Sequence, residues 1–338
     1  MTFIELEDVE KVFSVRRRTG LVRREKREVR AVDGISFGVA RGEMVGYIGP
    51  NGAGKSTTIK MLTGILTPSG GRLRVAGIDP SPSSRLRSSR GGPNRERTRL
   101  AQRIGVVFGQ RTTLWWDLPL KDSYRLMHRM YRIPDERFAA NLARCVELLE
   151  LGDLLDVPVR QLSLGQRMRG DIAAALLHDP DVLYLDEPTI GLDVVSKARV
   201  REFLRELNAS RGTTVLLTTH DLTDIEQLCK RVMVIDHGRL MYDGELAGLH
   251  EAGSSDRLLV VDLERELPPI ELPGARFVRS EGPRQVLAFP ASASAAPLVA
   301  AVAEAYPLVD LSVREPDIEA VIAKMYGERE LEVRPGSP

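Results

Sequence analysis

The sequence predicts an α/β protein whose first 248 residues form a parallel-sheet core and whose remainder forms a small α+β domain. Short apolar runs at residues 44–48, 104–108, 182–185 and 214–217 are typical of buried parallel strands, and helical patterns separate them. After Gly248 the pattern changes to alternating strands and an alanine-rich helix, which indicates a separate unit.

The first apolar run leads into a phosphate-binding loop, and a helical run follows it to Leu62. A strand before the loop and a helix after it are the context that this motif needs. The glycines let backbone N–H groups converge on phosphate oxygens, Lys55 reaches the β and γ phosphates, and Ser56 supplies a hydroxyl to Mg²⁺. The loop therefore predicts a nucleoside triphosphate site made by Gly49, Pro50, Asn51, Gly52, Ala53, Gly54, Lys55, Ser56 and Thr57.

Two carboxylates end the third apolar run. Asp186 and Glu187 follow residues 182–185, so both stand at the carboxyl end of a predicted parallel strand, the side of the sheet where the phosphate loop also begins. We expect Asp186 to hold Mg²⁺, directly or through water, and Glu187 to polarise the attacking water.

Two further strand ends supply a histidine and a glutamine. The run 214–217 leads through two threonines to His220, whose imidazole can hydrogen-bond a γ phosphate. The run 104–108 leads to Gln110, whose amide can bind a metal or water and then swing away. Taken singly, such a histidine is more often structural and an acidic pair is often a helix cap, but their order and spacing favour one catalytic set.

A second anion site is predicted at residues 162–166, with the sequence Leu-Ser-Leu-Gly-Gln. Ser163 is expected to cap the helical run that follows, and the free N–H groups beyond it, near Gly165 and Gln166, attract an anion. Because the chain already has a phosphate loop, this helix is expected to face the nucleotide of another copy. The sequence therefore predicts a two-fold dimer with nucleotide between the copies.

Together these motifs resemble the nucleotide-binding subunit of an ABC transporter. The phosphate loop, Gln110, the Leu-Ser-x-Gly-Gln segment, the Asp186-Glu187 pair, residues 190–193 and His220 occur in the family's order over about residues 3–248. Within the family, residues 108–119 and 161–168 resemble ATPases of ABC-2-type exporters of the viologen or multidrug export kind.

The resemblance implies a P-loop core with a RecA-like parallel sheet, an antiparallel β subdomain, and ATP and Mg²⁺ as cofactors, with Gln110 among the metal ligands. It places Phe13 against adenine, although a strand residue packed inward is the alternative, and it places Asp193 against the partner copy's phosphate loop. The family usually has glycine at position 164, where this chain has leucine. The Ser163 hydroxyl and the backbone N–H after position 164 are retained, so we expect function to persist.

Composition and charge exclude several classes of function. The 338 residues include 48 basic and 47 acidic side chains, and this net charge of +1 gives no case for nucleic-acid binding. Cys145 and Cys229 each stand alone in a helical pattern and are expected to be buried and reduced. No apolar run approaches the roughly 18 residues of a membrane span, and the acidic start does not resemble a signal peptide. The expected location is the cytoplasmic face of the cell membrane, beside separate membrane-spanning subunits.

Basic charge is concentrated in two segments. Residues 16–30 carry eight basic side chains against two acidic ones, and residues 85–103 carry seven against one. We expect both to be mobile loops, the second within an insertion at residues 81–99. A solvated loop and a contact with anionic lipid are the two interpretations left open for them.

A helical subdomain is expected at about residues 111–170, with helices at 121–131 and 135–149. In the ABC family this subdomain meets the membrane subunits. It begins with Trp115 and Trp116. We expect one indole to pack inward and the other to be exposed, as on a strand, and the alternative is that both fill the core between subdomains.

Residues 249–330 are predicted to form the α+β accessory domain, and residues 331–338 a disordered tail. Strands are expected at 257–263, 276–279, 285–289 and 309–314, and helices at 295–306 and 316–326. This domain contains no catalytic constellation. We expect it to steady the dimer, and regulation is the less supported alternative.

The predicted function is ATP hydrolysis by a homodimer that closes around two Mg·ATP and powers export through ABC-2-type permease subunits. A soluble ATPase of the translation-factor or DNA-repair kind is disfavoured, because relatives of that kind have two cassettes or a long coiled coil. A membrane-associated regulatory ATPase that signals through partners without moving a substrate stays open as an alternative. The transported substrate is not encoded here, since the selective pocket lies in other chains.

Overall fold

The computed structural model describes residues 2–18, 24–80, 92–109, 111–219, 221–252, 256–290, 292–314 and 321. The chain divides into two compact units, Met1–Gly244 and Glu245–Pro338. The first unit contains a six-stranded and a three-stranded sheet, and the second contains a four-stranded sheet.

The six-stranded sheet has the order β5-β6-β7-β3-β8-β9. Five strands run parallel: β3 (Met44–Ile48), β5 (Ile104–Phe108), β6 (Val182–Asp186), β7 (Thr214–Thr218) and β8 (Arg231–Asp236). β9 (Arg239–Glu245) follows β8 after a two-residue turn. The parallel strands are apolar and almost wholly buried, as expected for strands covered on both faces. Their carboxyl ends therefore lie on one side of the sheet.

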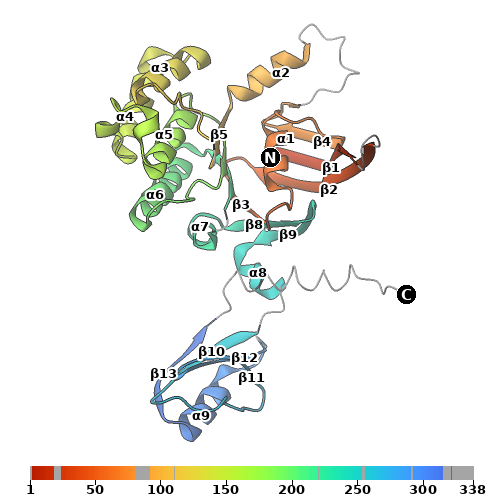
Figure 1. The fold of residues 1–338 in the computed structure, drawn as a ribbon, viewed down its shortest axis with the longest axis vertical. Coiled ribbons are helices and arrows are strands. Elements are labelled where there is room, and N and C mark those ends of the chain that lie inside the picture. Colours follow the sequence, from red (N-terminus) through yellow and green to blue (C-terminus); the bar gives the residue numbers. More distant parts are fainter. Residues whose placement is uncertain are drawn as a thin grey trace. The chain divides into compact units, whose positions relative to one another are not determined.

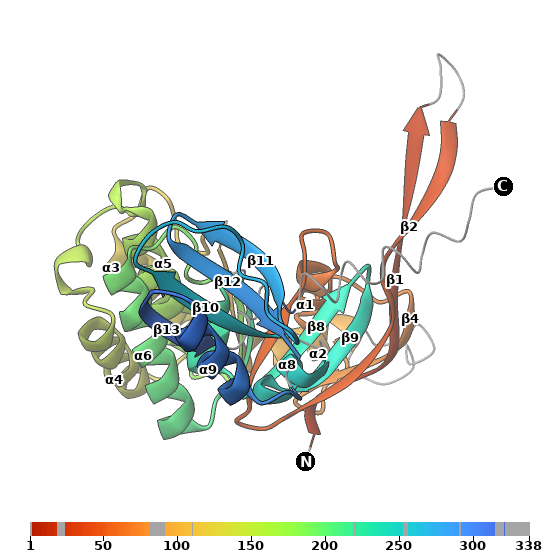
Figure 2. The same cartoon turned by 90° about the horizontal axis from the view of Figure 1, so that it is seen from below.

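The three-stranded sheet is antiparallel and has the order β2-β1-β4. It contains β1 (Thr2–Arg18), β2 (Arg24–Ala40) and β4 (Gly70–Val75). β4 pairs with β1 only as far as Glu10, whereas β1 and β2 remain paired to Arg18 and Arg24. The two strands thus continue as a ribbon beyond β4 (Figure 2).

The expectation of a mobile loop at residues 16–30 is wrong, because residues 16–18 and 24–30 are strand. Charged residues there hide the alternation by which a strand is usually recognised, and backbone pairing stabilises the ribbon. The insertion at 81–99 is also not all loop: α2 (Gly92–Ala101) contains its last residues, while 81–91 lie outside the described part of the chain. Arginine and glutamate are good helix formers, and fully buried Leu100 anchors α2 in the core.

The main core lies between the two sheets of the first unit, around α1 (Lys55–Leu62). Ile59 and Met61 of α1 are fully buried there, together with Ile4 of β1, Val32 of β2 and Tyr47 of β3. This packing fixes α1, and with it the loop that precedes it, against the carboxyl end of β3.

The helical subdomain contains α3 (Leu120–Tyr131), α4 (Asp135–Leu148) and α5 (Leu164–Leu176), which gather together in Figure 1. The first two helices lie where helical spacing predicts them. The same unit also contains α6 (Val194–Arg211) and α7 (Leu222–Leu228). Nowhere in the described ranges does a helix have the length and apolar character needed to cross a membrane.

Both cysteines are buried and free, as predicted. Burial raises the pKa of each thiol to about 12, so neither is a reactive thiolate near neutral pH. Cys229, however, follows the last residue of α7 in extended backbone and is not part of a helix.

The second unit begins with α8 (Leu246–Ala252) and contains the sheet β11-β12-β10-β13. Its strands are β10 (Arg257–Leu263), β11 (Arg276–Glu281), β12 (Arg284–Phe289) and β13 (Leu308–Arg314), and α9 (Ala295–Ala305) packs against the sheet. Leu298 and Val302 of α9 join buried Leu259 and Phe289 in a separate core. The helix predicted at 316–326 falls outside the described residues except for residue 321, and the predicted tail lies wholly outside them.

Candidate active site

The phosphate loop connects β3 to α1 and exposes the N-terminus of that helix. Gly54 is the N-cap residue, with φ of 111°, and no side chain caps the helix. A Cβ at this position would lie 2.5 Å from the carbonyl oxygen of Ala31, so only glycine fits. The N–H groups of the first turn, which includes Ser56 and Thr57, therefore remain available to an anion.

Lys55, the first residue of α1, is buried. Its ammonium group donates to the carbonyl oxygens of Gly49 at 2.5 Å and Pro50 at 3.1 Å. Burial lowers the pKa of Lys55, and the nearby charges of Glu187 and Asp186 oppose this shift. The lysine is thus held between the loop and the two carboxylates that end β6.

Ser56 and Asp186 meet although 130 residues separate them in the sequence. The Ser56 hydroxyl donates to Asp186 Oδ2 at 3.1 Å, and the Thr218 hydroxyl donates to Asp186 Oδ1 at 2.6 Å. The first turn of α1 and the ends of the neighbouring strands β6 and β7 therefore place oxygen atoms side by side. Sequence reasoning did not identify Thr218, since a threonine at a strand end has no distinguishing spacing.

Glu187 has a left-handed backbone conformation, with φ of 56°. Such a conformation is uncommon for a residue other than glycine and persists only where the surroundings impose it. Here the Glu187 N–H donates to the Thr218 carbonyl oxygen at 2.9 Å, and the Gly109 N–H donates to the Asp186 carbonyl oxygen at 2.7 Å. Strands β5 and β7 thus hold the Asp186-Glu187 turn from both sides.

Ser56, Asp186 and Glu187 line a cavity of about 380 Å³. Its lining comes from the phosphate loop, α1 and the ends of β5 and β6: Asn51, Ser56, Lys60, Ile65, Phe108, Gly109, Arg111, Asp186 and Glu187. Gln110 and His220 lie outside the described residues, but the neighbours of Gln110 on both sides line this cavity.

The Leu-Ser-Leu-Gly-Gln segment opens α5, as the sequence predicts. Ser163 is the N-cap residue: its hydroxyl accepts from the Gln166 N–H at 3.2 Å, and the Gln166 side chain accepts from the Ser163 N–H at 2.9 Å. None of the residues described as lining the cavity comes from this segment. The segment and the phosphate loop of one chain therefore do not share one cavity.

Asp193 and Phe13 also lie apart from the cavity lining that the structure describes. Asp193 caps α6, and hydrogen bonds from the N–H and hydroxyl of Ser196 hold the pKa of its carboxyl below the ordinary value. Phe13 is half-buried in β1, and the Lys11 ammonium lies 5.2 Å from the centre of its ring.

Asp171 on α5 is a further polar residue that sequence reasoning missed. It is buried, and one carboxylate oxygen accepts from the Thr112 hydroxyl at 3.0 Å and from the Thr113 N–H and hydroxyl at 2.8 and 3.0 Å. Burial raises the pKa of Asp171, although these hydrogen bonds oppose the shift. The helix that carries Ser163 is thereby tied to the segment just after Gln110.

The two tryptophans differ from expectation. Trp115 and Trp116 lie in irregular backbone and are 37% and 49% exposed, so the prediction that one packs inward is wrong. Strand alternation does not apply outside a strand. The Arg167 guanidinium lies 5.4 Å from the centre of the Trp116 ring, and the Ser123 hydroxyl accepts from the Trp115 N–H at 3.1 Å.

The cavity fits a Mg-bound nucleoside triphosphate. Uncapped N–H groups and Lys55 suit phosphate oxygens, and the adjacent Ser56 and Asp186 oxygens suit Mg²⁺, which prefers few protein ligands together with water and phosphate. The described residues contain no cluster of three or more His, Cys, Asp or Glu side chains that could form an all-protein metal site.

Comparison with known proteins gives a consistent answer. A family model described as ABC transporter matches residues 32–190. The ABC transporter ATP-binding protein NatA of Bacillus subtilis (strain 168) is 33% identical over 233 residues, which are 69% of this chain and 89% of that protein. A daunorubicin resistance ATP-binding protein of Streptomyces coeruleorubidus is 38% identical over 69% of each chain. The Nod factor export ATP-binding protein I of Ralstonia nicotianae is 39% identical over 67% of this chain and 66% of its own length.

Solved structures agree on the fold. A bacterial ABC transporter cassette solved as a dimer superimposes with a TM-score of 0.60 at 25% identity, over 72% of this chain and 98% of that one. The predicted fold, a parallel-sheet ATPase core with an antiparallel sheet and helices, is thus confirmed. The chain belongs to the family of ABC transporter ATP-binding proteins, and it is an ATP hydrolase of that family.

Proposed function

We propose that two copies of this chain bind two Mg·ATP between them, hydrolyse the nucleotide and thereby drive export through separate ABC-2-type membrane subunits. The observation that carries this proposal is the meeting of Ser56 with Asp186 at 3.1 Å, in the cavity that Glu187 also lines. A phosphate loop, a pair of metal-binding oxygens and a carboxylate for water are the parts that phosphoryl transfer to water requires.

Each residue has a distinct task in this proposal. The N–H groups of the loop and Lys55 hold the β and γ phosphates, and Ser56 and Asp186 hold Mg²⁺, with Gln110 as a further ligand. Mg²⁺, when bound, neutralises charge that develops on the phosphate oxygens. Glu187 orients the attacking water, and His220 donates to the γ phosphate. Phe13 stacks on adenine.

The second copy completes the site. The segment with Ser163, Gly165 and Gln166 is an exposed helix N-terminus that one chain does not use in its own cavity, and an anion of the partner's nucleotide would satisfy it. Asp193 would then meet the partner's phosphate loop. Exposed apolar Ile190, Val194 and Val195 flank Asp193, which supports burial of this surface against another copy.

The names of two relatives support export. One is called a Nod factor export ATP-binding protein, and the other a daunorubicin resistance ATP-binding protein. The same names disfavour a regulatory ATPase that moves no substrate. A place at the cytoplasmic face of the membrane follows, with permease subunits as separate chains.

The Glu187→Gln variant tests the chemistry. Its ATP hydrolysis rate should fall by about 100-fold or more, because a general base contributes at least this much. ATP affinity should persist, since the phosphate loop is intact, and mass measurement with ATP should reveal an accumulated dimer. Glu202→Gln, the same change at an exposed residue of α6, is the control and should hydrolyse at the wild-type rate. Near-wild-type turnover of Glu187→Gln would remove Glu187 from this role.

The Ser163→Arg change, added to Glu187→Gln, tests the second copy. A bulky cation at the N-cap should prevent dimer formation with ATP while each monomer still binds nucleotide. Ser294→Arg is the matched control, because Ser294 also caps a helix, α9, in the other unit. Equal dimer formation with and without Ser163→Arg would contradict the shared site, even if Glu187 proves catalytic.

A further inference from the structure

A buried polar network lies beside the catalytic segments and has no part in the mechanism above. Asp224 of α7 is fully buried, and its carboxylate accepts from the hydroxyls of Thr189 and Thr219, the latter at 3.3 Å. Thr189 stands two residues after Glu187, and Thr219 directly precedes His220. Both threonines are 3% exposed. One carboxylate oxygen, Oδ2, therefore connects the segment that follows β6 to the segment that follows β7.

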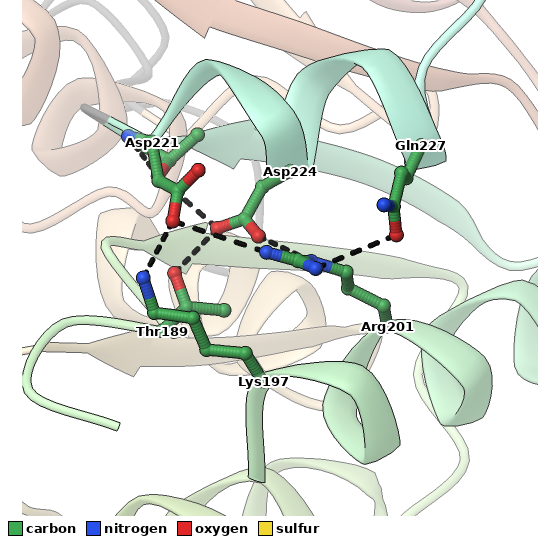
Figure 3. Close-up of polar contacts among 7 residues, drawn as sticks. Thr189, Lys197, Arg201, Asp221, Asp224 and Gln227 are labelled. Carbon is green, nitrogen blue, oxygen red and sulfur yellow. Dashed lines mark hydrogen bonds and ion pairs between the residues drawn. The ribbon is translucent and has the colours of Figure 1, made fainter. Parts of the chain in front are cut away.

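A cation from α6 balances this carboxylate. Arg201 Nε donates to the other oxygen, Asp224 Oδ1, at 2.5 Å, and Arg201 also donates to Gln227 Oε1 at 3.4 Å (Figure 3). α6 begins at Val194, directly after Asp193. The same carboxylate is thus also tied to the helix that holds the segment after Glu187.

A second pair flanks the first. Lys197 Nζ donates to Asp221 Oδ2 at 2.5 Å, and Arg201 lies 3.8 Å from the same oxygen (Figure 3). The Asp221 N–H donates to the Thr219 hydroxyl at 3.0 Å. Thr219 and Asp221, the residues before and after His220 in the sequence, therefore both belong to the network.

Stability alone does not account for a network of this kind. Burying an ion pair costs desolvation energy that its attraction barely repays, and apolar residues of similar size are often as stable. Such a pair does fix the local geometry, because a buried polar atom that loses its hydrogen-bond partner costs free energy.

We propose that Asp224 and Arg201 are positioning residues that hold the segment after β6, which contains Glu187, against the end of the segment after β7 through the hydroxyls of Thr189 and Thr219. The inference rests on the proposed function, in which Glu187 and the residue that follows Thr219 act on the same water and γ phosphate. Neither Asp224 nor Arg201 lines the cavity, so both act through the threonines.

Thr189→Val and Thr219→Val test the inference, because valine keeps the shape and removes the hydroxyl. Each should lower kcat about tenfold or more, as small misplacements of catalytic groups do, with KM for ATP and ATP affinity within about twofold of wild type. Thr189→Ser and Thr219→Ser, which retain the hydroxyl, should restore kcat. Thr214→Val is the matched control: this threonine is fully buried in β7 and accepts from the Gly42 N–H, but it lies outside the network.

The double variant gives a readout that loss of stability does not mimic. Since either change cuts the same connection, Thr189→Val with Thr219→Val should lower kcat no further than the more severe single change. Asp224→Asn should give the same kcat as the double variant, and if it fails to fold, the threonine series decides alone. Any one of three results would overturn the inference. The first is a wild-type kcat in both single variants, and the second is a double variant whose loss of kcat is the product of the two single losses. The third is a loss of kcat in Thr214→Val as large as that in the network variants. Glu187→Gln, assayed in parallel, separates the two claims, because full activity of that variant overturns the proposed function instead.

Discussion

Leu164 occupies space that exists only because residue 191 is glycine. A Cβ on Gly191 would lie 2.4 Å from Leu164 Cδ2, and Gly191 has a φ of 67°. Leu164 is 38% exposed, so the contact covers part of an otherwise solvated side chain. The leucine that departs from the family pattern therefore packs against the segment between Glu187 and Asp193 in the same chain.

Gly191→Ala should destabilise the protein more in the wild type than in a Leu164→Gly background. In the wild type the methyl group displaces the Leu164 side chain from this contact, and that cost adds to about 1–2 kcal/mol for the left-handed backbone. With glycine at 164 only the backbone cost remains. Urea unfolding of the four chains measures the coupling. Gly212→Ala is the control, because Gly212 has a φ of 63° and an added Cβ would have no neighbour within 4 Å. This change should lower the free energy of unfolding equally in both backgrounds. An equal loss for Gly191→Ala in both backgrounds would contradict the contact with Leu164.

Residues at the ends of parallel strands were predictable, and those that support them were not. Ser56, Asp186 and Glu187 come together because parallel strands bring their carboxyl ends to one side of the sheet. Asp224 offers no such signal, since an acid in the first turn of a short helix has an ordinary local explanation. Its partner Arg201 lies 23 residues earlier on an amphipathic helix, where an arginine is expected in solvent.

At the scale of elements, the ribbon of β1 and β2 shows why charge is a poor guide to loops. The register continues through Arg17 opposite Glu25 to Arg18 opposite Arg24, so the basic residues of both strands share one ribbon. A two-stranded ribbon has no buried face of its own, and its sequence then lacks the apolar alternation that marks a strand. Helices α3 and α4, each of which packs on α5, do carry a periodic signal, namely apolar residues at helical spacing.

The ribbon concentrates positive charge, and we expect it to bind anionic vesicles. Binding to vesicles with acidic lipid should exceed binding to neutral ones by about 1 kcal/mol per engaged basic residue. This difference should decrease as salt is added. Replacing Arg16, Arg17, Arg18, Arg23 and Arg24 by serine should abolish the difference. The control removes the same charge from exposed positions elsewhere, namely Arg125, Arg205, Arg265, Arg276 and Arg279. Equal binding to both vesicles at low salt would identify the segment as solvated.

Across the whole molecule, exposed surfaces need a separate explanation from the cavity in which ATP is hydrolysed. The first unit has exposed apolar residues that do not line this cavity. The strands and helices of both units were largely predictable from period and composition. Which apolar residues are exposed could not be predicted from the sequence, because exposure depends on which distant segments of the chain pack against a residue. Trp115 and Trp116 are the clearest case: Leu126 and Met130 of the following helix are also exposed, at 37% and 63%. Large apolar residues exposed over one segment are typical of an interaction site.

We therefore expect the two tryptophans to meet the membrane subunits, next to the segment that contains Gln110. Trp115→Ala and Trp116→Ala should leave the isolated subunit folded and hydrolytically active, because neither indole is in a core. When coexpressed with the proposed membrane subunits, each variant should copurify less and support less transport, since aromatic anchors dominate interface energies. Val309→Ala, an equally simple truncation of a residue 70% exposed in the second unit, is the control. Wild-type copurification and transport by both tryptophan variants would place the docking site elsewhere, and misfolding of both would show that the indoles support the subdomain instead.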